Sequence, residues 1–132
     1  MPLNAKELDH LLNTEELAYI ATTNADGTPH LMPIWFIYHN GKLYFETDNT
    51  TVKFKNIQRL NKVAVCIGGK NTYIINGSVK WFTEQELNFP IRKMFWDKYA
   101  KEMDDSYITK KTLLFEVVPK KTDSWHYAPN WD

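Results

Sequence analysis

The sequence predicts a mainly β chain, a small antiparallel barrel with a few helices. Segments rich in branched and aromatic residues follow one another closely, and turn signals separate them. The strongest of these signals is Asn40-Gly41, the dipeptide typical of a two-residue hairpin. Strands so close together fit an antiparallel barrel better than a doubly wound parallel sheet. The chain has 132 residues, of which 43% are hydrophobic, so we expect one domain over residues 1–132.

Three helical regions are expected. Asn4 with Glu7 forms a capping pair that opens a short helix, which plugs one end of the sheet. A second helix spans Thr51 to Leu60. Thr83 with Glu86 is another capping box, and it opens a helical region that Pro90 interrupts. An apolar stripe at helical spacing follows, which we interpret as core: Ile91, Met94, Phe95, Tyr99 and Met103.

Six strands are expected, and turn residues separate most of them. They span Ala18–Thr23, Pro29–His39, Lys42–Thr47, Lys62–Gly68, Tyr73–Phe82 and Thr112–Val118. Pro119 should end the last of these, because proline cannot donate to a strand ladder. Asp123 to Tyr127 is a candidate for a short further strand.

Composition excludes several functions. Sixteen basic and sixteen acidic side chains give no net charge, which disfavours nucleic acid and anionic membranes as partners. The sequence has no apolar signal region and no apolar stretch of membrane-spanning length, so we expect a cytoplasmic protein. The lone Cys66 allows no intramolecular disulfide. Paired histidines at metalloprotease spacing, CxxC, the dinucleotide fingerprint and the nucleophile elbow are all absent, so we expect no metal site.

A candidate phosphate site follows the strand that ends at Thr47. The strand runs directly into a helix whose first turn carries Thr51, Lys53 and Lys55. The unpaired N–H groups of a helix N-terminus attract anions, and hydroxyl and ammonium groups add donors. The alternative interpretation is a capped helix with solvated lysines.

Five segments carry a resemblance to a known family. They are residues 21–30, 33–36, 42–47, 53–57 and 76–79. Their order and spacing resemble the flavin-binding split-barrel superfamily, which includes the pyridoxamine 5'-phosphate oxidase-like proteins, over roughly residues 8 to 82. The resemblance implies an antiparallel six-stranded split β-barrel with a few flanking helices.

The resemblance also implies a binding site for flavin mononucleotide (FMN). The strand over Leu31 to Phe36 would lie along the flavin ring, and Thr51 with Lys53 match the residues that hold the cofactor phosphate. The cofactor-binding residues implied in this way are Met32, Pro33, Ile34, Trp35, Glu46, Thr47, Thr51, Lys53, Lys55 and Asn56. We nominate no catalytic residue, because the flavin itself carries the hydride.

The chain departs from the true pyridoxamine phosphate oxidases. Those enzymes are longer and have an arginine and histidine motif near the C-terminus, whereas no arginine follows Arg92 here. Leu31 stands where they have an arginine on the first cofactor strand. Oxidation of vitamin B6 is therefore not expected.

Other cofactors and roles stay open. The deazaflavin coenzyme F-420 would also suit the site, with Lys55, Arg59 and Lys70 as extra cationic contacts. Haem is a weaker alternative and would need an axial histidine such as His30, His39 or His126. The function expected is an FMN oxidoreductase acting on a small organic substrate. The alternatives are an F-420-dependent reductase or a non-catalytic carrier or sensor of flavin or haem.

Aromatic residues make up 14% of the chain, more than a core this small usually needs. We expect some of them to cover the cofactor in a homodimer with the cofactor at its interface, as the resemblance also implies. The candidates for this covering surface are Trp81, Trp96, Tyr99, Trp125 and Trp131.

Overall fold

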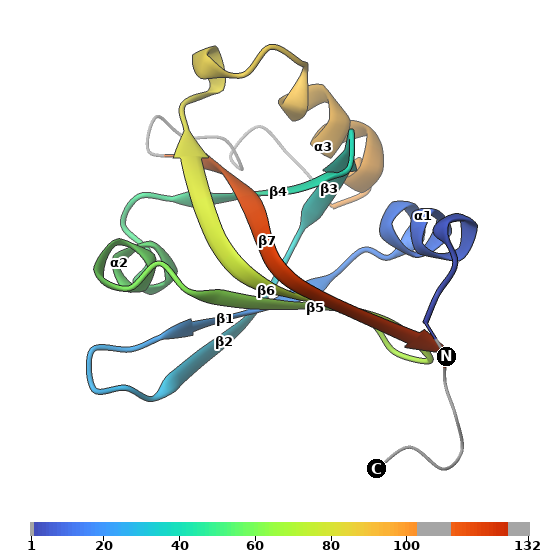
Figure 1. Cartoon of the computed structure of the whole chain (residues 1–132). Helices are drawn as coiled ribbons and strands as arrows, with labels where there is room; N and C mark the ends of the chain where they lie inside the picture. Colours follow the sequence, from blue (N-terminus) through green and yellow to red (C-terminus); the bar gives the residue numbers. More distant parts are fainter. Residues whose placement is uncertain (1, 103–111, 127–132) are drawn as a thin grey trace.

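The computed structural model describes residues 2–102 and 112–126, and in these ranges the chain forms one curled antiparallel sheet with helices around it (Figure 1). The strands are β1 (Ala18–Thr23), β2 (Pro29–Ile34), β3 (Phe36–His39), β4 (Lys42–Asp48), β5 (Val63–Gly68), β6 (Asn71–Phe82) and β7 (Thr112–His126). The helices are α1 (Ala5–Thr14), α2 (Val52–Arg59), α3 (Ile91–Tyr99) and the short 3-10 helix η1 (Glu84–Glu86). The strand order is β2-β1-β5-β6-β7-β4-β3.

The sheet has seven strands, so the expectation of six was wrong. The segment expected as one strand over Pro29 to His39 breaks at Trp35 into β2 and β3, which lie at opposite edges of the sheet. The Tyr99 hydroxyl fixes this break, since it accepts the Phe36 N–H at 2.9 Å and lies 2.8 Å from the Glu16 carbonyl oxygen. Because consecutive residues join the two edges, the sheet must curl into a half-barrel.

The last strand is longer than expected. β7 continues through Pro119 to His126, and its register against β6 shifts between Asn76 and Gly77. This irregularity removes the need for an N–H donor at Pro119, which is why proline is tolerated inside the strand. A Cβ at Gly77 would collide with the Val118 carbonyl, so only glycine fits opposite the proline. The expected end at Val118 was therefore wrong, and Tyr127 lies outside the described residues.

Most of the expected helix signals are confirmed. Asn4 and Glu7 form the capping box of α1, and Thr51 caps α2 through the Phe54 N–H at 3.2 Å. Thr83 and Glu86 also form a capping box, but it opens only η1, and Pro90 separates η1 from α3. Met103 lies outside the described residues.

Strand β4 is buried on both faces, and this positions the site. Leu43 and Phe45 point into the barrel core together with residues such as Phe115. The alternate residue Tyr44 packs under α3 in a second cluster, whose other buried members are Ile37, Ile91, Phe95, Tyr99 and Leu114. Glu46 follows Tyr44 on this second face, because side chains alternate along a strand.

The stripe on α3 is therefore core at Ile91, Phe95 and Tyr99, as expected. Tyr99 is only 1% exposed, so its assignment to a surface that covers the cofactor was wrong. Trp81 and Trp96 are about two-fifths exposed, and Trp131 lies outside the described residues.

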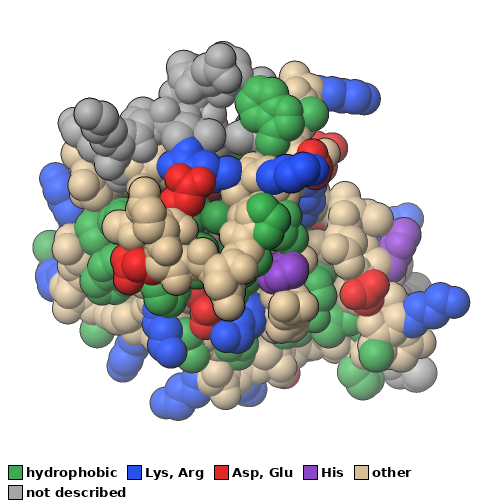
Figure 2. Space-filling model, turned by 90° about the horizontal axis from the view of Figure 1, so that it is seen from above, with side chains coloured by type: hydrophobic (Ala, Val, Ile, Leu, Met, Phe, Trp, Pro, Cys, Tyr) green, Lys and Arg blue, Asp and Glu red, His purple; other side chains and the backbone are tan. Residues whose placement is uncertain are grey.

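Charged side chains of both signs are interspersed on the face that Figure 2 shows, rather than gathered in a patch of one sign. None of the helices in the described ranges has the length and apolarity to cross a membrane.

Candidate functional site

A pocket of about 280 Å³ lies where β4 ends and the chain turns into α2. Its lining residues are Glu46, Thr47, Asp48, Thr51 and Thr112. The first three come from the end of β4, and Thr51 is the N-cap of α2. Thr112 begins β7 and is the register partner of Asp48. Two strand ends and one helix start therefore meet around the pocket.

The threonine hydroxyls of the pocket are held in a chain of hydrogen bonds. Thr47 Oγ1 donates to Thr51 Oγ1 at 3.3 Å, and Thr51 Oγ1 donates to the Asp48 carbonyl at 3.1 Å. Thr51 Oγ1 also accepts the Phe54 N–H, which caps one donor of the first helical turn. The backbone N–H groups of Val52 and Lys53 have no acceptor within the helix, so they are available to a ligand oxygen.

Glu46 is the electrostatically unusual member of the pocket. It is 9% exposed, and its Oε2 has no hydrogen-bond partner among the described residues. Burial raises the pKa of its carboxyl to about 7, with Arg92 acting to lower it and Glu84 to raise it. Arg92 stabilises the Glu46 carboxylate only weakly, because its Nε lies 2.6 Å from Glu84 Oε2, in an ion pair. The carboxyl of Glu46 is therefore shared between its neutral and charged forms near neutral pH.

Lys53 is half-buried in the first turn of α2, and burial lowers its pKa. Within the described ranges no carboxylate forms an ion pair with it. Lys55, two residues on, is exposed. Of the two lysines, Lys53 is thus the one that is partly desolvated and has no ion-pair partner among the described residues, and a bound anion would supply a counter-charge.

The structure brings only some of the predicted residues together. Glu46, Thr47 and Thr51 line the same pocket. Of the residues predicted beside the flavin ring, Met32, Pro33 and Ile34 end β2 and Trp35 follows it. None of the four lines this pocket. Met32 and Pro33 are exposed, Ile34 is core, and the Trp35 ring stacks on Tyr99 with centroids 4.5 Å apart. Their contact with a cofactor stays a prediction.

Asn56 lies on the other side of α2. Its amide donates to Thr22 Oγ1 at 3.1 Å and to Asn24 Oδ1 at 3.0 Å, and its Oδ1 accepts from Arg59. The side chain is 3% exposed. Asn56 therefore joins α2 to β1 and the turn after it, and its bond to a cofactor stays a prediction.

Sequence reasoning missed Asp48, Thr112 and Arg92 as parts of this site. The two-residue spacing of Glu46 and Asp48 was a usable signal, because it places both on one strand face. Thr112 and Arg92 carried no local signal. They reach the site only through the β4–β7 register and the packing of α3.

The donors around the pocket fit a phosphate group. Two hydroxyls, the first-turn N–H groups of α2 and a desolvated lysine ammonium are the donor types that bind phosphate oxygens. In the part of the chain that the structure describes, no three His, Cys, Asp or Glu side chains are grouped to hold a metal ion.

Comparisons with known proteins agree with this fold. A conserved hypothetical protein from Mycobacterium tuberculosis superposes with a TM-score of 0.76 at 19% identity, covering 98% of this chain and 91% of its own. A protein named F420 Reductase gives a TM-score of 0.73 at 20% identity, with 86% and 94% covered. An FAD-binding protein from Mesorhizobium loti gives 0.69 at 17% identity, with 94% and 95% covered. Identities this low show the fold alone.

Sequence comparison assigns the family. No curated protein matches the chain. The family model described as pyridoxamine 5'-phosphate oxidase matches residues 5–126, nearly the whole chain. The resemblance seen in the sequence is thereby confirmed, and the chain belongs to the pyridoxamine 5'-phosphate oxidase family.

Proposed function

We propose that this protein binds FMN and is an oxidoreductase that transfers a hydride to or from a small organic molecule. The observation that carries the proposal is the start of α2, where Thr47 and Thr51 present linked hydroxyls to the pocket and the first helical turn carries the partly desolvated Lys53 ammonium. Family membership adds support, as do the names of the structural relatives, one an F420 reductase and one an FAD-binding protein.

In this proposal the phosphate is held by Thr47, Thr51, Lys53 and the free N–H groups of α2. The flavin ring lies along the Met32 to Trp35 segment, and a second copy of the chain covers it. When bound, the flavin supplies the hydride chemistry. The chain itself binds and orients the cofactor and excludes water, so no side-chain acid or base is assigned to the reaction.

The placement of the cations supports FMN over the larger F-420. A longer anionic tail would need further cations beside the phosphate site. Arg59 instead bonds the Thr23 carbonyl and Asn56, and Lys70 lines a separate pocket beside α1. Of the three cations considered for that tail, only Lys55 lies near the start of α2.

The test is an absorbance and fluorescence spectrum of the purified protein after addition of FMN or F-420 and removal of free ligand on a sizing column. FMN should stay bound at about one per chain on a dimer-sized peak. NADH or NADPH should then reduce the bound flavin, and a panel of organic substrates should reoxidise it. Loss of both cofactors on the column would refute the proposal, and a bound but inert flavin would identify a carrier instead.

A further inference from the structure

The pocket at the end of β4 is lined both by groups that attract an anion and by groups that can repel one. Its hydroxyls, helix N-terminus and nearby lysine suit an anion, yet two carboxyl side chains, Glu46 and Asp48, also line it. A carboxylate and a phosphate carry charge of the same sign and repel one another. If both carboxyls were ionised, they would oppose the phosphate that the rest of the pocket attracts.

The two carboxyls differ in their surroundings. Asp48 Oδ1 accepts a hydrogen bond from Thr112 Oγ1 at 3.2 Å, and its residue is only partly buried. Glu46 is more than nine-tenths buried, and its Oε2 has no partner among the described residues. A buried carboxylate without a donor is costly, whereas a buried carboxylic acid without a donor is much less so. The geometry therefore favours a proton on Glu46.

The charged groups that face Glu46 do not reverse this preference. On the α3 side they are Arg92 and, from η1, Glu84. These two form their own ion pair at 2.6 Å, so the net charge they present is small. From β7, the register partner of Glu46 is Leu114, which is apolar and buried.

We propose that Glu46 is a proton-dependent latch for the cofactor phosphate: the neutral acid donates a hydrogen bond to an oxygen of the bound anion, and the carboxylate excludes the anion. The proposal deepens the FMN proposal and rests on it. When the ligand binds to protein in which Glu46 is ionised, the Glu46 carboxylate takes up one proton from solution. The complex then contains the neutral acid and the ligand. Because the pKa of Glu46 lies at about 7, the latch works within the physiological range.

The first experiment measures FMN affinity between pH 5.5 and 9 for the wild type and Glu46→Gln, whose amide also donates a hydrogen bond. Above pH 7 the Kd of the wild type should rise about tenfold per pH unit relative to that of the variant. This ratio removes the titration of the FMN phosphate, which both proteins share. Calorimetry at pH 8 in two buffers of different ionisation enthalpy should find one proton taken up by the wild type and none by Glu46→Gln. The latch would be overturned if the Kd values of the wild type and Glu46→Gln changed in parallel with pH and the two proteins took up the same number of protons.

Two further variants test whether the pH dependence of FMN binding comes from Glu46 or from the overall charge of the protein. Glu84→Gln frees the Arg92 charge, which stabilises the Glu46 carboxylate. In this variant the Kd should therefore begin to rise at a lower pH than in the wild type, and the rise should remain. Glu116→Gln removes a carboxyl of β7 that lies on the same face of the sheet, opposite Tyr44, and that pairs with Lys42 at 3.6 Å. It should leave the pH dependence of Kd unchanged. If Glu116→Gln changed the pH at which Kd begins to rise as much as Glu84→Gln does, the pH dependence would come from the overall charge of the protein and not from Glu46.

A ligand-free measurement separates this proposal from the FMN proposal. With ¹³C-labelled glutamate, the carboxyl signal lost in Glu46→Gln is followed against pH, with and without inorganic phosphate as the probe. Phosphate should raise the titration midpoint of Glu46. If FMN fails to bind but phosphate raises the midpoint, the flavin assignment falls and the latch stands. An unmoved midpoint overturns the latch whether or not FMN binds.

Discussion

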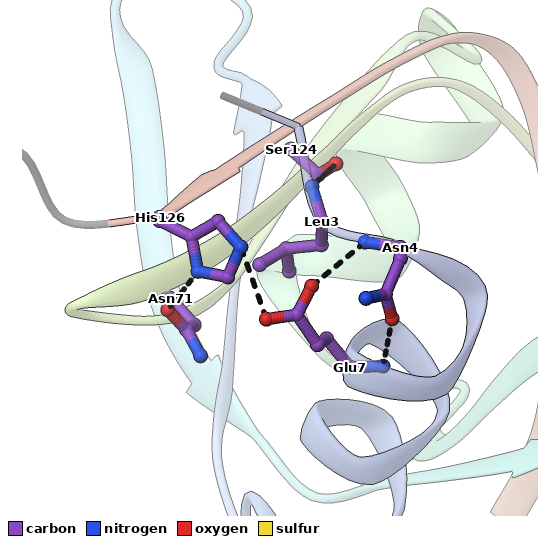
Figure 3. A network of polar contacts seen from close by, with 6 residues as sticks. All are labelled: Leu3, Asn4, Glu7, Asn71, Ser124 and His126. Atoms are coloured by element: carbon purple, nitrogen blue, oxygen red, sulfur yellow. Dashed lines mark hydrogen bonds and ion pairs between the residues drawn. The ribbon is translucent and has the colours of Figure 1, made fainter.

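The polar groups at the two ends of the barrel are arranged in opposite ways. At the α1 end, a set of side chains and backbone groups that we name the α1 clasp ties the N-terminal helix to the β6–β7 strand ends. Its members are Leu3, Asn4, Glu7, Asn71, Ser124 and His126 (Figure 3). At the other end, the pocket between β4 and α2 holds Glu46 and, in the adjoining first turn of α2, Lys53.

Five polar contacts join the members of the clasp, so each of its residues has at least one polar partner. His126 Nε2 lies 3.0 Å from Glu7 Oε2, and its Nδ1 lies 3.2 Å from Asn71 Oδ1. The Leu3 N–H donates to Ser124 Oγ at 3.1 Å, and Asn4 and Glu7 complete the capping box. These groups are partly exposed, so water competes for each bond. At the pocket, in contrast, Glu46 Oε2 is buried with no hydrogen-bond partner among the described residues, and the half-buried Lys53 ammonium has no ion pair in those residues. Such groups are found more often at functional sites than in structural networks.

The largest effect should come from Glu46→Gln on stability. Folding raises the pKa of this carboxyl from 4.5 to about 7, so the folded state holds a proton that the unfolded state has released. The free energy of unfolding of the wild type should therefore fall as pH rises from about 4.5 to 7, then level off. At about 1.4 kcal/mol per pKa unit the loss reaches about 3 kcal/mol, and Glu46→Gln should not show it.

Urea denaturation of the ligand-free protein at pH 4.5, 6, 7 and 8 measures this difference, with Glu116→Gln as the matched control. The Glu46→Gln variant should be the more stable protein at pH 8. If its stability fell with pH as steeply as that of the wild type, Glu46 would be an ordinary solvated carboxylate, and the contrast between the two ends would disappear.

Lys53→Ala should have the next largest effect. Losing a charge-assisted contact to phosphate should weaken FMN binding by roughly 1.5 to 3 kcal/mol. Because burial disfavours the Lys53 charge in the free protein, the ligand-free variant should be no less stable than the wild type. Fluorescence titration with FMN measures the affinity, and Lys62→Ala, which removes an exposed lysine beyond the other end of α2, is the control. Equal affinities in the two variants would place the phosphate elsewhere.

Thr51→Ala removes the cap of α2 and should cost about 1 kcal/mol of stability, measured by urea denaturation. It should also weaken FMN binding, because the same hydroxyl lines the pocket. Thr50→Ala changes an exposed neighbour and should do neither. A loss of stability with unchanged FMN affinity would limit Thr51 to capping.

Glu7→Gln should have the smallest effect. The residue pairs with His126 at 3.0 Å, but both side chains are about one-third exposed, and such pairs contribute up to about 1 kcal/mol. The variant should lose less than this in urea denaturation and bind FMN as the wild type does. A change in FMN affinity would show that the α1 clasp affects the pocket. The clasp could then no longer be assigned a purely structural role.

The sequence predicted the local structure well because short-range physics fixes it. The hairpin at Asn40-Gly41 forms with both residues at positive φ, 50° and 77°, as this dipeptide favours. The α1 capping box and the Thr51 cap depend on contacts within three residues, so they too could be read in advance. Family membership followed from the order of such segments along the chain.

Long-range packing decided the rest. The strand break at Trp35 depends on the Tyr99 hydroxyl, which comes from α3, and the passage of β7 through Pro119 depends on a shift of register opposite Gly77. Neither partner is visible from the local pattern, since pairing register is a property of two strands together.

The same division holds for the candidate site. From the sequence alone came Glu46, Thr47, Thr51 and Lys53 as a strand end followed by a helix start, because neighbouring residues must lie near one another. Only the tertiary structure buried Glu46, paired Arg92 with Glu84 and left Glu46 Oε2 without a hydrogen-bond partner among the described residues. Desolvation depends on every element packed around a group, so the protonation of Glu46 was settled by the fold and not by its neighbours in sequence.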